Sequence, residues 1–259
     1  MAERQKSRSI GLARALSKLG YCSRSQGFSL VRSGRVTVNG RVHRDPEYPV
    51  RATDRVAVDG RSIVAAEQIY LMMNKPRGLV TTTADEKGRA TVYSLLDPAL
   101  GWLAPVGRLD QASEGLLLFT NDSAWAATIT SPDSHVEKTY RVQIAAVADE
   151  ALLSKLMAGV KEGSEMLRAV RASILRTGKR NSWVELVLDE GRNRQIRRMF
   201  AGLDIEMLRL LRVAIGPLVL GDLAKGHVRS LAPEEKEALD HLLPDNQDPT
   251  VKKSFSRRA

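Results

Sequence analysis

The chain has 259 residues, a formal net charge of +10 and a sequence pI near 9.9. This length suffices for one large domain with a small one, or for two domains of medium size. The excess positive charge indicates a polyanionic partner, most simply a nucleic acid. It is concentrated at the start, because residues 1–61 hold 13 basic and 5 acidic residues. We therefore expect a basic module followed by a nearly neutral body.

Several classes of protein are disfavoured by composition. A single cysteine, Cys22, excludes an internal disulfide framework and fits a reducing compartment. The four histidines are scattered without ligand spacing, so we expect no structural or catalytic metal. No apolar run approaches the length of a membrane span, and residues 1–6 lack the apolar core of a secretory signal. These features predict a cytoplasmic protein without membrane association.

Residues 8–61 are expected to fold as a compact module with two helices and a small sheet. Leucines and alanines recur at helical spacing in the first helix, and Ser23 with Gln26 forms a capping-box pattern for the second. Asn39-Gly40 joins two short β segments and is a strong hairpin signal. The module is also rich in arginine.

Three motifs of this module resemble an S4 RNA-binding domain: Leu12-Ala13-Arg14-Ala15-Leu16, Cys22-Ser23-Arg24 and Gly34-Arg35-Val36-Thr37-Val38-Asn39-Gly40. The acidic residue usual early in the second helix is replaced by Gln26-Gly27, and a helical glycine costs roughly 1 kcal/mol. The resemblance implies contacts with the RNA backbone, which give affinity more than sequence readout. The alternative is a solvated basic face. The implied contact residues are Arg14, Ser23, Arg24, Arg32, Arg35 and Asn39.

A short, flexible linker is expected at residues 62–68, a larger domain at 69–243 and a disordered basic tail at 244–259. In the larger domain, apolar runs and alternation predict strands, and helical spacing with capping residues predicts helices. The predicted strands cover 69–73, 79–83, 116–120, 140–144, 169–176, 183–188, 207–213 and 227–231. The predicted helices cover 122–130, 149–158, 195–203 and a last helix that begins at Pro233.

The segment from Pro105 to Thr120 combines a loop with a buried strand and places a carboxylate, Asp110, on that loop. Gly107 and Gly115 allow tight bends on either side. A neighbouring guanidinium, such as that of Arg108, favours the charged form of a carboxylate. A charged Asp on a loop above a rigid sheet suits a nucleophile, although an ordinary surface ion pair fits the same pattern.

Other candidate residues lie further along the chain. Arg194 and Arg198 are four residues apart and are expected on one helix face, with Arg197 beside them. A solvated charge run is the alternative. Tyr140 alternates with apolar residues along a strand, which plain core packing also explains. Lys75 lies in the turn Asn74-Lys75-Pro76-Arg77-Gly78, where its charge could meet phosphate or only water.

Four motifs, in order and spacing, resemble the RsuA/RluB family of ribosomal RNA pseudouridine synthases: Asn74-Lys75-Pro76-Arg77-Gly78, Gly107-Arg108-Leu109-Asp110, Glu137-Lys138-Thr139-Tyr140 and Glu190–Met199. The resemblance implies an α+β protein: a small S4 module, and a catalytic domain with a mainly antiparallel sheet and flanking helices. It also implies a ribosomal RNA or ribosome assembly intermediate as partner, and no cofactor. We expect a monomer, since nothing in the sequence marks a self-association surface.

By this resemblance, Asp110 is the essential carboxylate and acts as a nucleophile or as a base at the ribose. Tyr140 stacks on the flipped uracil, and Arg197 pairs with Asp110. Substrate contacts are implied for Arg108, Lys75, Arg194 and the pocket-lining Leu210.

Two other functions compete with this interpretation. A non-catalytic RNA-binding or ribosome-assembly factor could keep the fold, but it need not retain Asp110, Tyr140 and Arg197 together. A base-excising enzyme could use Asp110, but it would release free uracil, which is easily detected.

Overall fold

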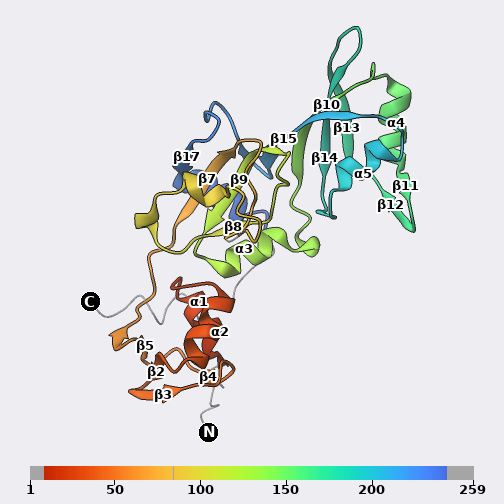
Figure 1. Cartoon of the computed structure of the whole chain (residues 1–259). Helices are drawn as coiled ribbons and strands as arrows, with labels where there is room; N and C mark the ends of the chain where they lie inside the picture. Colours follow the sequence, from red (N-terminus) through yellow and green to blue (C-terminus); the bar gives the residue numbers. More distant parts are fainter. Residues whose placement is uncertain (1–8, 84, 244–259) are drawn as a thin grey trace.

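The computed structural model describes residues 9–83 and 85–243. The chain forms a small N-terminal domain and a larger domain built on a nine-stranded sheet (Figure 1). The predicted α+β class with a mainly antiparallel sheet is confirmed. The basic tail expected at residues 244–259 lies outside the described residues.

The N-terminal domain packs two helices against short strands. Its capping box forms as predicted, because the Ser23 hydroxyl accepts from the Gln26 amide and the Gln26 side chain accepts from the Ser23 amide. Asn39 and Gly40 both adopt left-handed φ angles, of 51° and 81°, as a tight hairpin turn requires. Its elements are β1 (Ile10–Gly11), α1 (Leu12–Lys18), α2 (Arg24–Arg32), β2 (Val36–Val38), β3 (Arg41–His43), β4 (Pro49–Val50), β5 (Val56–Val58) and β6 (Arg61–Ser62).

Gly27 explains how the two helices pack so closely. A Cβ added at this position would lie 2.9 Å from the carbonyl oxygen of Ala13 on α1. The glycine that lowers the helix propensity of α2 is therefore required where α2 crosses α1.

The connection between the domains is hydrogen-bonded on both sides. The Ala66 amide donates to the Leu19 carbonyl of the N-terminal domain over 3.0 Å. On the other side, the Asn121 side chain accepts from the Ile69 amide and donates to the Glu67 carbonyl. Helix α1 also contacts α3 (Ser123–Thr130) of the larger domain. The segment expected as a linker thus follows a path that both domains fix.

The larger domain contains most of the predicted elements. Its strands are β7 (Tyr70–Lys75), β8 (Ala104–Val106), β9 (Glu114–Thr120), β10 (Lys138–Ile144), β11 (Val160–Glu162), β12 (Glu165–Leu167), β13 (Arg171–Thr177), β14 (Ser182–Leu188), β15 (Met207–Ile215), β16 (Leu218–Val219) and β17 (Val228–Ser230). Its helices are α3 (Ser123–Thr130), α4 (Glu150–Ala158), α5 (Gln195–Ala201) and α6 (Pro233–Asp240), with 3₁₀ turns η1 (Val92–Leu95), η2 (Pro98–Leu100) and η3 (Pro132–Ser134).

Two local expectations differ from the structure. The strand predicted at 79–83 is wrong, since this segment makes only an isolated bridge between Val80 and Thr91. Its Thr81 hydroxyl instead donates to the Leu109 carbonyl. The β11–β12 hairpin was not predicted, because strands of three residues are too short to show alternation.

The large sheet consists of two halves that meet at one parallel pair of strands. Its strand order is β13-β14-β10-β15-β9-β7-β17, and β9 and β15 run parallel where Glu114 and Gly115 face Leu211 and Arg212. Gly115 has a φ of +101°, and a Cβ there would lie 2.2 Å from the Arg212 carbonyl oxygen. Only glycine allows this approach. Figure 1 shows β15 crossing from one half to the other.

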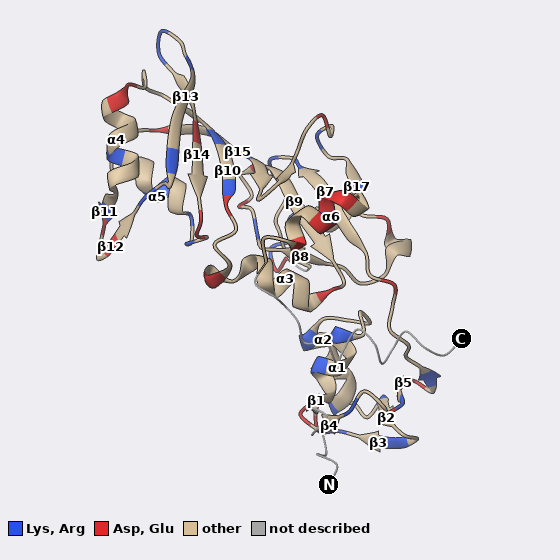
Figure 2. Cartoon of the chain, turned by 180° about the vertical axis from the view of Figure 1, so that it is seen from behind, with Lys and Arg blue, Asp and Glu red and all other residues tan. Residues whose placement is uncertain are grey.

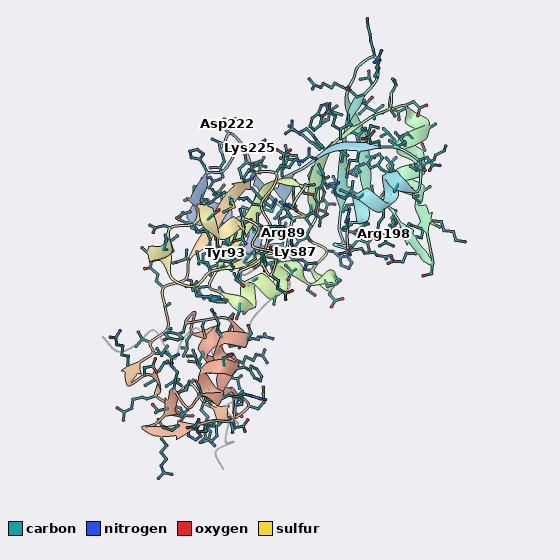
Figure 3. All side chains as sticks on the ribbon, in the orientation of Figure 1. Lys87, Arg89, Tyr93, Arg198, Asp222 and Lys225 are labelled. Atoms are coloured by element: carbon teal, nitrogen blue, oxygen red, sulfur yellow. The ribbon has the colours of Figure 1, made fainter. Side chains whose placement is uncertain are left out.

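A buried carboxylate also connects the two halves. Glu114 on β9 accepts from Arg209 on β15 at 3.1 Å and from Lys225 at 2.6 Å. Figure 3 shows Lys225 on the loop that precedes β17. Burial raises the pKa of Glu114, but the hydrogen bonds from both cations outweigh this effect and lower it. Glu114 is therefore held in its charged form at the junction.

Each half of the sheet has its own hydrophobic core. One core lies between β10, β14, α4 and α5, and the other cores lie on both faces of β7 and β9. Tyr140 packs against a core of each half, which places its ring at the junction. Basic side chains occur on both domains, including α1 and α2 (Figure 2). Within residues 9–83 and 85–243, no helix has the length and apolar character needed to cross a bilayer.

Candidate active site

The loop between β8 and β9 carries Asp110 at the junction of the two half-sheets. Gly107 has a φ of +75° and Gly115 one of +101°, so both bends use the conformations expected of glycine. Within the loop, the Ser113 amide donates to the Asp110 carbonyl over 2.9 Å. The Asp110 carboxylate remains accessible, with 43% of its side chain exposed.

The segment that follows β7 holds this loop in place. The Gly78 amide donates to the Gln111 carbonyl, and the Gln111 side chain donates back to the Gly78 carbonyl. Thr81 binds the Leu109 carbonyl at 2.8 Å. Asp110 is therefore positioned by hydrogen bonds on both sides of it in sequence.

Lys75 lies beneath the loop and is fully buried. Its ammonium donates to the carbonyls of Pro76, Asp110 and Ser113 at 3.1, 3.1 and 2.9 Å. Burial lowers the pKa of Lys75 to about 8, although the charges of Asp110 and Glu114 oppose this shift. The substrate contact expected of Lys75 does not fit this position, since its donors are directed at the backbone of the loop.

Two arginines at the start of α5 face the Asp110 carboxylate. The Nε of Arg197 lies 3.5 Å from Asp110 Oδ2, and that of Arg194 lies 3.9 Å from the same atom. Arg197 also donates from Nη2 to the Ser113 hydroxyl at 3.3 Å. Burial lowers the pKa of Arg197, and the charge of Asp110 opposes that shift. A guanidinium remains charged in proteins, so this group attracts the carboxylate and fixes its orientation.

The expected grouping of Arg194 with Arg198 is wrong. Arg194 precedes α5 in a left-handed conformation with φ of 50° and points toward Asp110. Arg198 points the other way, where it binds Glu162 and Glu165 of the β11–β12 hairpin. An N-terminal cap with positive φ breaks the helical spacing on which the expectation relied.

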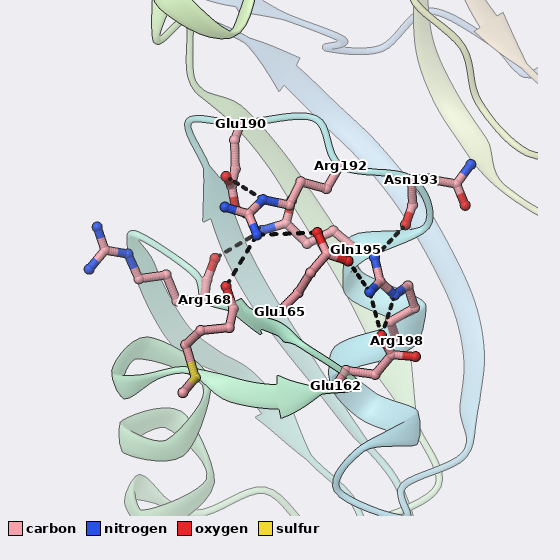
Figure 4. A network of polar contacts seen from close by, with 9 residues as sticks. Glu162, Glu165, Arg168, Glu190, Arg192, Asn193, Gln195 and Arg198 are labelled. Carbon is pink, nitrogen blue, oxygen red and sulfur yellow. Dashed lines mark hydrogen bonds and ion pairs between the residues drawn. The ribbon is translucent and has the colours of Figure 1, made fainter.

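Arg198 belongs to a polar network that attaches α5 to its surroundings (Figure 4). Arg192 contacts Glu190 at 2.8 Å and Glu165 at 3.4 Å. Gln195, the first residue of α5, donates to Glu190 at 2.7 Å. Hydrogen bonds from Glu162 and Glu165 raise the pKa of Arg198. The network fixes the helix from which Arg197 reaches Asp110.

A cavity of about 200 Å³ opens above Asp110 at the junction. Tyr140 of β10 and Leu210 of β15 line it together with Arg108, Arg194 and Arg197. Tyr140 and Leu210 contribute an aromatic and an aliphatic side chain to its lining. The Asp110 carboxylate and the facing guanidinium groups of Arg194 and Arg197 contribute its charged part. Six of the seven site residues predicted for this domain therefore lie around one cavity, and Lys75 lies below it.

The charged partner of Asp110 differs from the first expectation. Arg108 lines the cavity and is exposed, but no ion pair joins it to Asp110 in the described part of the chain. The guanidinium groups that face the carboxylate come from α5, more than eighty residues later. Sequence neighbours were thus a poor guide to spatial neighbours here.

The residues predicted to bind RNA on the N-terminal domain lie on α1, α2 and the β2–β3 hairpin. Arg14, Arg24 and Arg32 are exposed, and their guanidinium groups make no hydrogen bond to other residues within 9–83 and 85–243. Arg35 is paired with Asp59 at 2.5 Å. Two of the residues have structural contacts: Ser23 caps α2, and Asn39 binds Asp54 and the Arg55 amide.

The polar residues of the cavity that sequence reasoning missed include Ser113, Lys138 and Arg212. Alternation along the strands could have indicated two of them. Lys138 lies two residues before Tyr140, and Arg212 lies two residues after Leu210, so each shares a face with a predicted residue. The described residues contain no group of three or more His, Cys, Asp or Glu side chains suited to a metal ion.

Comparison with known proteins adds the following similarities. Residues 69–202 match a family model described as RNA pseudouridylate synthase, and residues 10–56 match that of the S4 domain. Ribosomal large subunit pseudouridine synthase B of Bacillus subtilis (strain 168) is 33% identical, over 89% of this chain and 96% of its own. Ribosomal small subunit pseudouridine synthase A of Pasteurella multocida (strain Pm70) is 37% identical, over 82% and 92%. A crystal structure of a pseudouridylate synthase superposes with a TM-score of 0.63 at 32% identity, covering 89% of this chain and 100% of that one.

Proposed function

This chain belongs to the RNA pseudouridylate synthase family, and we propose that it isomerises one specific uridine of ribosomal RNA to pseudouridine, with Asp110 as the catalytic carboxylate. The observation that carries the proposal is a single cavity in which Asp110, Arg197 and Tyr140 meet. The names of the relatives support ribosomal RNA as the substrate, since one acts on the large and one on the small subunit.

The reaction rearranges one nucleotide and needs no other reactant. The bond between C1′ and N1 breaks, the uracil turns, and a bond forms between C1′ and C5. The proton on C5 leaves, and N1 gains one. Asp110 acts on the ribose, and its position on a loop fixed by backbone hydrogen bonds keeps it ready for that step.

Tyr140 and Arg197 support this step in different ways. A uridine that leaves an RNA helix loses its stacking, and the ring of Tyr140 replaces part of that interaction. Arg197 orients the carboxylate through the 3.5 Å contact. Leu210 lies on the same wall as Tyr140 and packs against the base, and the exposed Arg108 contacts the RNA strand.

The N-terminal domain serves as a second anchor on the RNA. Its exposed arginines suit phosphate contacts, and the short connection raises the effective concentration of the catalytic domain at the target. We expect the protein to act as a monomer. An enzyme that modifies ribosomal RNA works in the cytoplasm, where this RNA matures. Its partner is the ribosomal RNA itself or a ribosome assembly intermediate.

The test maps pseudouridines by chemical labelling across the large and small ribosomal RNAs. Cells lack the protein, carry it intact, or carry Asp110→Asn, which keeps the shape of the side chain without its charge. We expect one position to be lost in the deletion and restored by the intact protein alone. Restoration by Asp110→Asn contradicts the role of Asp110. An unchanged map favours a non-catalytic binding factor, and release of free uracil from the RNA favours a base-excising enzyme.

A further inference from the structure

Two cations line the wall of the cavity that β10 and β15 form, away from Asp110. Lys138 lies two residues before Tyr140 on β10, so both side chains share a face of the strand. Arg212 lies directly opposite Tyr140 on β15. Strand β15 bulges at Val213, next to this pair, and the shift brings Ile215 to the cavity as well. Tyr140 is therefore flanked by a cation on its own strand and another across from it.

Arg212 is buried and only partly satisfied. It is 5% exposed, and its Nε donates to the Leu116 carbonyl at 2.7 Å. Its Nη2 is buried and has no hydrogen-bond partner among residues 9–83 and 85–243. Buried polar groups nearly always have a partner, so a free donor at this depth needs an explanation.

Lys138 is also without a matching partner. No residue of the described chain accepts a hydrogen bond from its ammonium, and its charged neighbours are Arg212 and Asp189. Burial lowers the pKa of Lys138, Arg212 lowers it further, and Asp189 opposes both. Asp189 is itself 42% exposed and lies 3.7 Å from His135. Lys138 thus has a second cation beside it and one nearby carboxylate, which water screens.

On the side of Asp110, Arg194 and Arg197 face a carboxylate. On the side of Tyr140, no residue of the described chain accepts a hydrogen bond from the Lys138 ammonium or from Arg212 Nη2, so positive charge there lacks a bound acceptor. Uracil is neutral and cannot balance it, whereas every nucleotide of the substrate brings a phosphate. A base stacked on Tyr140 carries its own flanking phosphates to within one nucleotide of Lys138.

We propose that Lys138 and Arg212 form a phosphate site for the substrate strand, in which Lys138 contacts the phosphate next to the flipped uridine. Arg212 lies beneath, fixed by Leu116, and adds a second positive charge that does not move. The site rests on the proposed function, since the phosphate belongs to the RNA whose uridine enters the cavity. It positions the nucleotide from the backbone, while Tyr140 and Leu210 hold the base.

The experiment uses the full-length protein and a synthetic RNA fragment that contains the mapped uridine. Lys138→Gln removes the charge, Lys138→Arg keeps it, and Lys155→Gln on the exposed face of α4 is the matched control. We expect Lys138→Gln to raise KM about tenfold with kcat within about twofold, because a phosphate contact binds ground and transition states alike. It should also reduce the slope of log KM against log salt by about one. Lys138→Arg should restore both.

A second arm identifies the ligand. Methylphosphonate linkages, which carry no charge, replace the phosphate on the 5′ or the 3′ side of the uridine in turn. At one of the two positions, the wild-type protein and Lys138→Gln should become equal. A defect that persists with both substitutions places Lys138 on the base or ribose and overturns the site. The phosphate site is also overturned if Lys138→Gln has the KM of the wild-type protein, or if its kcat falls while KM stays unchanged.

Binding of the same RNA is measured alongside turnover, which separates the two proposals. A protein that binds the fragment but forms no pseudouridine refutes the proposed function, while the binding constants of the Lys138 variants still decide the phosphate site. Arg212→Lys gives a further check, since it keeps the charge but loses the hydrogen bond to Leu116; KM should rise less than with Lys138→Gln.

Discussion

The arginines of the N-terminal domain and those of the cavity have the same chemistry but different surroundings. Arg24 and Arg32 are exposed on α2, and no residue of the described chain fixes their guanidinium groups. Arg197 has 20% of its side chain exposed and contacts both Asp110 and Ser113. An exposed cation contributes binding affinity that salt screens. A half-buried cation held by its partners instead fixes the orientation of the group that it contacts. Sequence position does not separate these two classes, but burial and partners do.

The largest loss of activity should come from changing Arg197, the half-buried arginine that contacts Asp110 and Ser113. Arg197→Lys keeps the charge but loses the planar group that meets both Asp110 and Ser113, and kcat should fall by about 100-fold. Arg194→Lys is the matched control, because Arg194 is 60% exposed and lies 3.9 Å away; we expect less than about tenfold. Single-turnover kinetics measure both. Equal losses in the two variants would contradict the distinction between fixed and exposed arginines.

The next largest loss of activity is expected from weakening the polar network between Arg198 and the β11–β12 hairpin, which holds α5. Glu162→Gln with Glu165→Gln removes both carboxylates from Arg198, and the helix that carries Arg197 loses an anchor. We expect kcat to fall by about fivefold with unchanged RNA affinity, because small displacements of a catalytic group are costly. Glu185→Gln, which removes an ion pair to Arg141 on the sheet, is the control. If stability alone changes, the network holds the fold and not the site.

The local elements could be predicted because their signals lie within a few residues. The capping box at Ser23 and Gln26 and the Asn39-Gly40 turn needed no distant contact. Likewise, the glycines around Asp110 predicted a loop with tight bends, and both adopt positive φ. These features follow from backbone chemistry that any fold must respect.

The remaining features depend on contacts across the fold. Lys75 is in a turn motif that reads as exposed, yet three carbonyls of the chain accept its protons in the interior. Gly27 is unfavourable for its own helix and is explained only by Ala13 of another. The parallel contact of β9 and β15 joins Gly115 to Arg212, and no local pattern indicates that pairing. The glycines around Asp110 indicated its loop, whereas its contact with Arg197 was implied only by the family resemblance and by no local pattern.

A smaller effect, on RNA affinity, is expected from changing the exposed arginines of the N-terminal domain. Arg24→Ala with Arg32→Ala should weaken RNA binding about fivefold at low salt and reduce the salt slope by about two, with kcat unchanged. Arg35→Ala is the comparison within the same domain. Since Asp59 already pairs with Arg35, its loss should change affinity less. Filter binding over a range of salt concentrations measures this. A salt slope that stays at its wild-type value in the double variant excludes these arginines from the RNA contact.

The smallest expected effect is on stability, and it tests whether the buried Lys75 loses its proton in the folded protein. Burial holds the pKa of Lys75 at about 8, against 10.5 for an exposed lysine, so between these values the unfolded chain binds one proton more than the folded one. Stability from this group therefore rises with pH from about 8 to 10.5, by roughly 1–3 kcal/mol at most. Lys75→Met lacks the titration, and it leaves three carbonyls without their donor, so it should be less stable at every pH. Urea unfolding at pH 7.5 and 9.5 should show the wild-type advantage over Lys75→Met growing with pH. A constant difference would mean that Lys75 keeps its proton throughout, with its three hydrogen bonds outweighing the cost of its burial.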